Sequence, residues 1–211
     1  MNYAWARDFA LELINQYSVA GDKVALSYNN QADYLARIPK LLDDAQTMVA
    51  TTVRRIRAAA PLSELTEVDT RHGWRVYKFP TDCWQFASGG LIRFTPHGVR
   101  RFHKYRLLSG DRIAVPSGVE DTAELEYFRY PKLLGTNPTD TAELDNTIEV
   151  QMALPYYVAA HLVMYDNNFA YGALYNEWEG KLERLYELPQ TELNITENVY
   201  DAAEWGAQIC E

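Results

Sequence analysis

One stretch of the chain restricts the fold more than any other. Residues 153–168, ALPYYVAAHLVMYDNN, are apolar on nearly every side of a helix and end on two asparagines. The apolar part, from Leu154 to Tyr165, is about a dozen residues long, whereas a bilayer crossing needs roughly 20. An all-round apolar helix of this length is buried in protein. We therefore expect a central helix from Pro155 to Asp166, with the proline in its first turn and the Asp-Asn-Asn sequence capping the next helix.

Helical spacing of apolar residues predicts three further helices. The first lies at the N-terminus, the second runs for about six turns, and the third follows the central helix. The three series are Tyr3, Ala6, Phe9, Ala10, Leu13, Ile14 and Tyr17; Leu35, Ile38, Leu42, Ala45, Val49, Val53 and Ile56; and Tyr171, Leu174, Tyr175, Trp178, Leu182 and Leu185. Pro39 is expected to kink the second helix or to mark a second start. Amphipathic helices from both ends of the chain bury their apolar stripes against each other, which predicts one bundle.

The middle of the chain has a different pattern, with short runs of Val, Ile, Tyr, Phe and Trp between turn residues. Such runs are typical of strands, which we expect near residues 74–79, 84–87, 91–95, 101–108, 112–115 and 124–130. The predicted fold is α+β and mainly α: a bundle of about four helices with an inserted β-rich segment and an acidic C-terminal tail. The expected boundaries are 1–70 with 150–188 for the bundle, 71–135 for the insertion, 136–149 for a connecting loop and 189–211 for the tail.

The net charge of −9 is unevenly distributed. Residues 1–115 contain 16 Lys and Arg against 11 Asp and Glu, and residues 116–211 contain 4 against 18. The acidic part is not expected to wrap nucleic acid tightly, because phosphate binding depends on Lys and Arg. The N-terminus is charged and has no long apolar run, so we expect neither a secretory signal nor a membrane anchor, and a cytoplasmic protein. Cys83 and Cys210 are far apart and are expected to be reduced thiols.

Motifs for catalysis or metal binding are weak. His97 and His103 have a spacing that no zinc pattern favours, and we expect both on the surface. His161 falls in the central helix, where a histidine bonded to a core partner is commoner than a catalytic base. The acidic pairs Asp43–Asp44 and Glu177/Glu179 are typical of solvated helix faces, although such pairs can also hold a metal or act as acid and base. We expect no catalytic residue, metal or cofactor, and hence no enzyme.

The basic stretch in the β-rich segment is the best candidate for a binding surface. Arg100, Arg101, Lys104 and Arg106 lie close together in sequence. In one continuous strand Arg100, Lys104 and Arg106 would share a face and Arg101 would lie on the other. The pattern fits a nucleic-acid patch or contact with an acidic neighbouring protein. The 15 tyrosines and 5 tryptophans also favour interfaces, although filling of the core by aromatic side chains remains an alternative.

The C-terminal tail combines carboxylates with Tyr200 and Trp205. It has no sustained helical stripe, so we expect that it does not order itself in an isolated subunit. Tyr and Trp contribute strongly to interfaces, and the tail is expected to dock on a partner or on a neighbouring subunit. A C-terminal helix packed on its own bundle is the alternative.

Three segments carry a resemblance to a known family. The first long helix, NNQADYLARIPKLLDDAQTMVATTVRRI, is similar to that of head-to-tail adaptor (connector) proteins of tailed bacteriophages. VYKFPTDCWQF resembles the start of the β insertion in that family, and LPYYVAAHLVMYDNNFAYGALYNEWEGKLERL resembles its closing helix pair. Together the segments cover most of residues 30–188, and the C-terminus beyond Leu188 matches no motif of the family.

The resemblance implies a structural virion protein at the head–tail junction, assembled in the host cytoplasm. Members form rings, commonly of twelve subunits, beneath the portal protein, and they join the head to a tail-side connector or tail protein. Double-stranded DNA passes through the ring without sequence-specific binding, and no membrane is involved. From the basic stretch and the tail described above, we expect the subunit or portal interface to include Arg100, Arg101, Lys104, Arg106, Tyr200 and Trp205. A nucleic-acid-binding module that uses the basic β segment is the main alternative, and an enzyme with a site built from scattered residues is a second one.

Overall fold

The computed structural model describes residues 1–16, 28–95, 98–108 and 111–187. The chain divides into two compact units, each with its own apolar core. Among the described residues, the helical unit is built from residues 1–56 and 130–187, and the β-rich unit spans Arg57–Arg129. The predicted tail, residues 189–211, lies outside the described residues.

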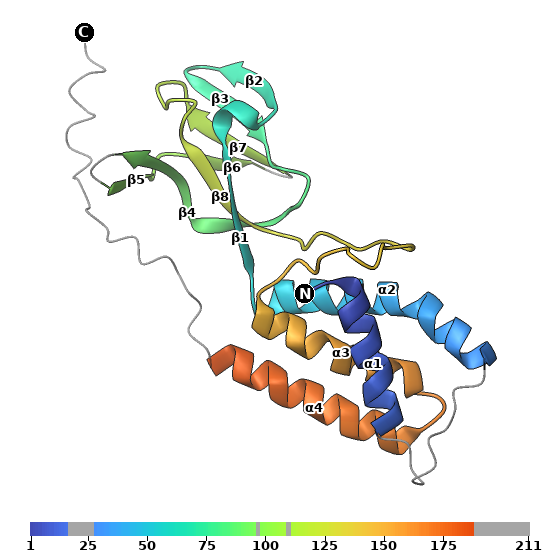
Figure 1. The fold of residues 1–211 in the computed structure, drawn as a ribbon. Helices are drawn as coiled ribbons and strands as arrows, with labels where there is room; N and C mark the ends of the chain where they lie inside the picture. The colour runs from blue at the N-terminus through green and yellow to red at the C-terminus, as the bar shows by residue number, and fades with distance from the viewer. Residues whose placement is uncertain (17–27, 96–97, 109–110, 188–211) are drawn as a thin grey trace. The chain divides into compact units, whose positions relative to one another are not determined.

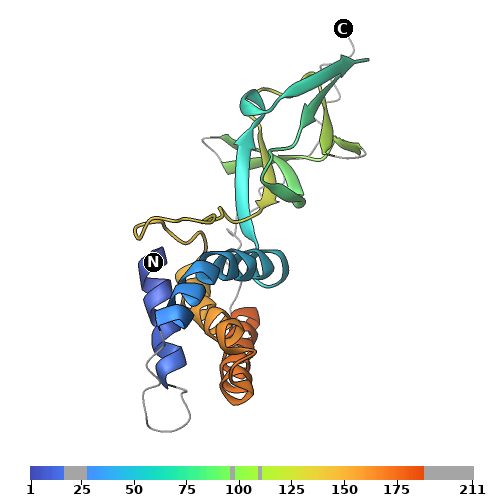
Figure 2. The same cartoon turned by 90° about the vertical axis from the view of Figure 1, so that its right-hand side faces the viewer.

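The helical unit is arranged around one central helix. Its helices are α1 (Tyr3–Gln16), α2 (Tyr28–Thr52), α3 (Ile148–Val163) and α4 (Asn168–Glu187). α3 packs against all three of the others, whereas α1 and α2 make few contacts with each other (Figures 1 and 2). Buried side chains therefore occur on every face of α3, including Leu154, Val158 and Leu162. The prediction of a central apolar helix is confirmed.

The prolines of this unit do not begin or break helices. α3 begins at Ile148, seven residues before Pro155, so the prediction that Pro155 lies in the first turn is wrong. α2 runs as one helix through Pro39, so no second start occurs there. A proline in a helix removes one backbone donor and strains the preceding turn. Burial of α3 against three neighbouring helices offsets that cost, since most helix stability in proteins comes from packing.

The turn between α3 and α4 is capped as its sequence predicts. The Asn167 Oδ1 atom accepts the backbone N–H of Ala170 at 3.1 Å, in the first turn of α4. The Asp166 carboxylate accepts the Tyr34 hydroxyl at 2.8 Å, which ties this turn to α2. Burial, reinforced by this hydrogen bond, raises the pKa of Tyr34 to about 12.

The β-rich unit contains two four-stranded sheets in the described residues. The strands are β1 (Ile56–Pro61), β2 (Glu67–Arg71), β3 (Trp74–Lys78), β4 (Cys83–Thr95), β5 (Gly98–Phe102), β6 (Arg106–Leu108), β7 (Arg112–Pro116) and β8 (Glu124–Arg129), with the 3-10 turn Leu62–Glu64. One sheet has the order β1-β8-β4-β5 and the other β2-β3-β7-β6. Their core comprises Leu62, Tyr77, Leu91, Ile113, Val115, Val119, Ala123 and Leu125.

Of the described residues, 46% are helical and 27% lie in strands, so the fold is a β-rich α+β fold. The prediction of a mainly α bundle is therefore wrong. Two strands that the sequence did not predict, β1 and β2, account for part of the difference. Residues 57–70, which sequence reasoning grouped with the helices, lie in the β-rich unit.

Composition explains why β1 and β2 are missed. β1, IRAAAP, is rich in alanine, the best helix former, and it becomes a strand because it lies beside β8 in a sheet. Arg57 of β1 forms an ion pair with the buried Glu126 of β8 at 4.0 Å. β2, EVDTR, is charged and exposed. It pairs with β3 through a two-residue turn, His72–Gly73, in which both φ angles are positive, 49° and 79°, as tight hairpin turns require.

Residues 101–108 are not one strand. β5 ends at Phe102 and β6 begins at Arg106, and the two strands belong to different sheets. The extended chain therefore changes sheets at residues 103–105. The alternation of faces predicted for one continuous strand does not apply across this break.

β4 carries an irregularity that needs a glycine. Phe86 pairs with Tyr127 and Leu91 with Leu125, so residues 87–90 bulge out of the ladder. Gly90 has φ of +55°, and the Phe86 ring occupies the space that a Cβ atom at this position would need. Only glycine combines this backbone conformation with so close an approach. The bulge thereby fixes the position of the Phe86 ring.

No helix in the described parts of the chain is both long and apolar enough to cross a membrane.

Candidate interaction sites

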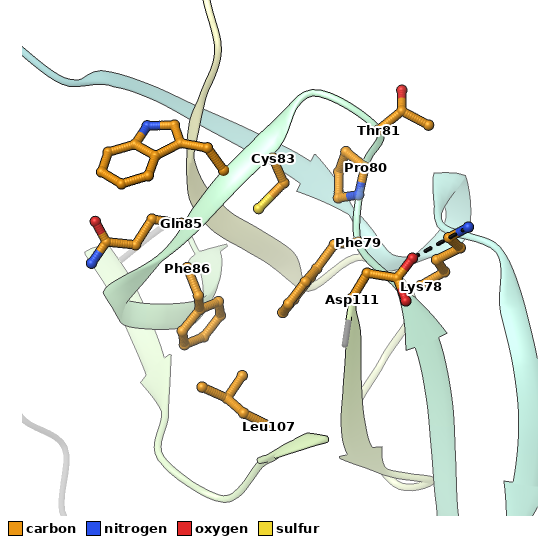
Figure 3. A pocket seen from close by; sticks show the side chains of 10 residues that line it. Lys78, Phe79, Pro80, Thr81, Cys83, Gln85, Phe86, Leu107 and Asp111 are labelled. Carbon is orange, nitrogen blue, oxygen red and sulfur yellow. Dashed lines mark ion pairs between the residues drawn. The ribbon is translucent and has the colours of Figure 1, made fainter. Parts of the chain in front are cut away.

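The β-rich unit has a pocket of about 700 Å³ (Figure 3). It is lined by the end of β3, the segment that leads into β4, the start of β4, β6 and the residue that precedes β7. The apolar part of its lining is Phe79, Pro80, Cys83, Trp84, Phe86 and Leu107, and the polar part is Lys78, Thr81, Gln85 and Asp111. Its volume falls in the range of ligand sites, and its lining combines six apolar residues with four polar ones.

Aromatic rings form the inner wall of this pocket. The rings of Phe79 and Phe86 stack with their centroids 6.0 Å apart and an interplanar angle of 23°. The ring of Tyr105 meets Phe86 edge-on at 5.2 Å. From the β6 side, Leu107 projects toward these rings and remains 55% exposed (Figure 3). The rings support one another, so the wall is preformed and its outer surface remains available to an apolar partner.

The rim of the pocket is charged. The Lys78 Nζ atom lies 3.2 Å from the Asp111 carboxylate, and the Arg112 Nε atom lies 4.0 Å from the same group. The hydrogen bond from Lys78 is the largest cause that lowers the pKa of Asp111. Two cations thus share one carboxylate, which leaves this part of the rim with an excess of positive charge.

Cys83, which lines the pocket, is a poor nucleophile. Burial raises its pKa to about 11, and the negative charge of Asp82 adds to the effect. Reactive cysteines have a lowered pKa, so this thiol is not set up for catalysis. Tyr127 donates its hydroxyl to Asp82 at 3.2 Å, and burial is the first cause that raises the pKa of Tyr127 to about 12.

The structure divides the basic residues proposed from the sequence between two sheets. Arg100 and Arg101 belong to β5, opposite Arg93 and Ile92 of β4, and the side chain of Arg100 lies outside what the structure describes. Arg101 is half-buried, and Lys104 is exposed between β5 and β6.

Arg106 begins β6 in the other sheet, and its guanidinium carbon lies 5.0 Å from the centroid of the Trp74 ring. The four basic residues therefore do not form one row on one strand. The two aromatic candidates, Tyr200 and Trp205, lie outside the described residues.

The helical unit exposes an apolar tip at the α3–α4 turn. Tyr165 is 84% exposed, Phe169 72% and Met164 36%. We call these three residues the turn cluster. The turn itself is held by the Tyr34–Asp166 bond and the Asn167 cap. Aromatic side chains on a rigid, solvent-facing turn are typical of contact surfaces.

His161 has the core partner that its sequence position predicts. Its Nδ1 atom lies 2.9 Å from the Tyr157 carbonyl oxygen, one turn earlier in α3. Its ring stacks on Tyr157 with a centroid distance of 3.9 Å and lies near Tyr171 and Tyr175 of α4. The histidine is thus part of an aromatic contact between two helices.

The acidic pairs show no arrangement for catalysis: Asp43 has a structural role, and the other three carboxylates are exposed. Asp43 accepts the backbone N–H groups of Leu134 and Gly135 at 2.7 and 3.0 Å, and so holds a loop against α2. Burial raises its pKa. Asp44, Glu177 and Glu179 are exposed. In the part of the chain that the structure describes, no group of three or more His, Cys, Asp or Glu side chains is placed to hold a metal ion. His103 is exposed, and His97 lies outside the described residues.

Sequence reasoning missed both the pocket and the turn cluster. The signal for the pocket is the run KFPTDCWQF, in which aromatic residues flank a turn. The signal for the turn cluster is that apolar residues stand on both sides of the Asp-Asn-Asn sequence, where a helix ends and burial is lost. Neither signal has a period, so a search for helical or strand spacing does not find them.

Comparison with protein-family models finds no match to this chain, and comparison with curated proteins finds none either.

Proposed function

We propose that the chain is a structural virion protein that forms a ring between the portal and the tail of a tailed phage. In this proposal copies of the chain bind one another and the portal protein, join the head to a tail-side protein and continue the DNA channel. The protein carries out no reaction and needs no cofactor. The proposal rests on the sequence resemblance of the long helix and of the closing helix pair, which are α2, α3 and α4.

The observation that favours an assembly role is the turn cluster. Tyr165 and Phe169 are 84% and 72% exposed on a turn that three hydrogen-bonding residues hold in place. Exposing such side chains to water is unfavourable by roughly 1.5–3 kcal/mol for a residue the size of Phe. A subunit that buries them against a neighbour gains that free energy on assembly, whereas a monomeric enzyme would gain nothing from them.

The first test is the assembly state of the purified full-length chain, alone and with a portal ring, measured by light scattering and electron microscopy. We expect a closed ring of defined size, free or bound to the portal. Replacing the exposed aromatics, Tyr165→Ser with Phe169→Ser, is expected to reduce ring formation at least tenfold. Tyr186→Ser is the matched control, since Tyr186 is also on α4 and is 62% exposed.

Two results would contradict the proposal. One is a chain that stays monomeric at all concentrations and also ignores the portal. The other is a monomer that binds free DNA with a steep dependence on salt, which would favour a nucleic-acid-binding module instead. Equal effects of the Tyr165/Phe169 variant and of Tyr186→Ser would show that the turn cluster is not a specific contact.

A further inference from the structure

We infer that the pocket of the β-rich unit binds the acidic C-terminal segment, residues 188–211, of a neighbouring copy, with Trp205 seated against Phe79, Phe86 and Leu107. The inference deepens the proposed function, and it rests on that function only for the source of the segment, a neighbouring copy in an assembly. It assigns a receiving site to a part of the chain for which the sequence predicts docking.

The pocket is suited to a large apolar side chain flanked by polar ones. Its volume of about 700 Å³ is larger than one side chain and falls in the range of preformed ligand sites. The stacked rings of Phe79 and Phe86 present aromatic surface, and an indole gains from offset or edge-on contact with such rings. Leu107, at 55% exposure, is available to cover the opposite side of the inserted ring.

The positive charges of Lys78 and Arg112 favour the acidic C-terminal segment as the occupant of the pocket. Residues 188–211 carry five carboxylate side chains and no Lys or Arg. Near the pocket, Lys78 and Arg112 share the single carboxylate of Asp111. The carboxylates of the segment are expected on the side of Lys78 and Arg112, whose charge they balance, and away from Asp82, whose negative charge acts on Cys83.

Length and composition of the chain agree with this occupant. α4, the last described element, ends at Glu187, and 24 residues follow it. Trp205 lies well inside that segment, and the five carboxylate residues of the segment are Glu192, Glu197, Asp201, Glu204 and Glu211. Donation of a segment to the next copy is a heterologous contact, and repetition of such a contact forms a ring when the rotation between copies closes.

The two cysteines of the chain provide the test. Cys83 lines the pocket, and Cys210 follows Trp205 by five residues. An equal mixture of ¹⁵N-labelled and unlabelled full-length chains is assembled and treated with a short bis-maleimide, and the cross-linked peptides are identified by mass spectrometry. Docking on a neighbour predicts Cys83–Cys210 peptides, about half of them with mixed labels. Thr81→Cys, exposed on the same pocket, supplies a faster-reacting thiol, so a slow Cys83 does not hide the contact.

Matched variants connect the cross-link to the pocket. Leu107→Ser and Trp205→Ala are each expected to reduce its yield at least fivefold. Leu108→Ser is the control, because Leu108 is the next residue of β6, is 40% exposed and does not line the pocket. An undiminished cross-link in Leu107→Ser would overturn the inference, and so would cross-links with uniform labels only, which would place the segment on its own chain.

Light scattering on the same samples separates this inference from the proposed function. A ring without the cross-link contradicts the docking site and leaves the ring proposal standing. A cross-linked pair or small oligomer that never closes into a ring supports the docking site and contradicts the connector. A monomer without the cross-link contradicts both.

Discussion

Single residues show how far local chemistry in this chain departs from what sequence alone suggests. Gly90 has a positive φ, and the Phe86 ring fills the space that a Cβ atom would need, so this position of β4 requires glycine. Asp43 reads as one of two solvated carboxylates, yet it holds two backbone N–H groups of a distant loop. Such roles depend on partners that are far away in the sequence, and no local pattern encodes them.

Cys83 gives a prediction at this scale. Its pKa of about 11, against an ordinary value of 9.0, lowers the thiolate fraction at pH 8 about a hundredfold, and the greater intrinsic reactivity of a more basic thiolate recovers about a factor of ten. We expect alkylation by iodoacetamide to be roughly tenfold slower than for a free cysteine. Because the pKa is raised, the rate should keep rising with pH toward 11. The measurement uses Cys210→Ser, so that only Cys83 reacts, and a rate profile that levels off near pH 9 would contradict the raised pKa.

Secondary-structure elements divide into those that the sequence predicts and those that it does not. The periodic series predict α1, α2 and α4, because each of these helices buries one stripe and one-sided burial leaves a period in the sequence, whereas the all-round apolar run predicts α3. β1 and β2 leave no such period, since β1 is alanine-rich and β2 is exposed. The ends of elements are also missed: α2 stops at Thr52, and Ile56, which continues its apolar spacing, begins β1.

The candidate sites were less predictable than the helices for a related reason. Arg101 and Arg106 are close in sequence, but the change of sheet at residues 103–105 sends them to different sheets. The pocket combines residues from two segments, Lys78 to Phe86 and Leu107 to Asp111, which pairing between strands brings together. Only the topology shows that such segments meet, and a single sequence does not determine topology.

The central position of α3 leads to a prediction for this element. Leu162 is 1% exposed and packs in the core of the helical unit, so Leu162→Ala should lower the free energy of unfolding by about 2–5 kcal/mol. Met164, two residues further and 36% exposed, is the control. Met164→Ala should change the free energy of unfolding by no more than about 0.5 kcal/mol. Urea unfolding followed by circular dichroism measures both. Equal effects of the two variants would show that α3 is not the centre of the bundle.

At the scale of the whole molecule, the chain consists of a helical unit interrupted by a β-rich unit. Two segments far apart in sequence, residues 1–56 and 130–187, form the described part of the first unit, and the 73 residues of Arg57–Arg129 form that of the second. The charges also differ: the β-rich unit has 11 Lys and Arg against 9 Asp and Glu, whereas residues 1–56 and 130–187 of the helical unit together have 9 against 15. The two-ended charge seen in the sequence thus reflects two units with different surfaces, which suits a subunit that meets different neighbours.

This division predicts that the helical unit folds without the β-rich unit. Every buried residue of its core belongs to α1, α2, α3, α4 or the segments beside them, and the core of the β-rich unit draws only on residues between Leu62 and Leu125. β1 and β8, by which the chain enters and leaves the β-rich unit, are adjacent strands of one sheet, so a short Gly-Ser linker in place of residues 57–129 can rejoin the helices.

We expect this variant to retain a helical circular dichroism spectrum and a cooperative thermal transition, since an independent core is what allows a unit to fold alone. Leu162→Ala in the excised chain should then destabilise it by about as much as in the full chain, because the residues around Leu162 are the same. A product that keeps helical content but melts without a cooperative transition would show that the strands are needed to complete the helical core.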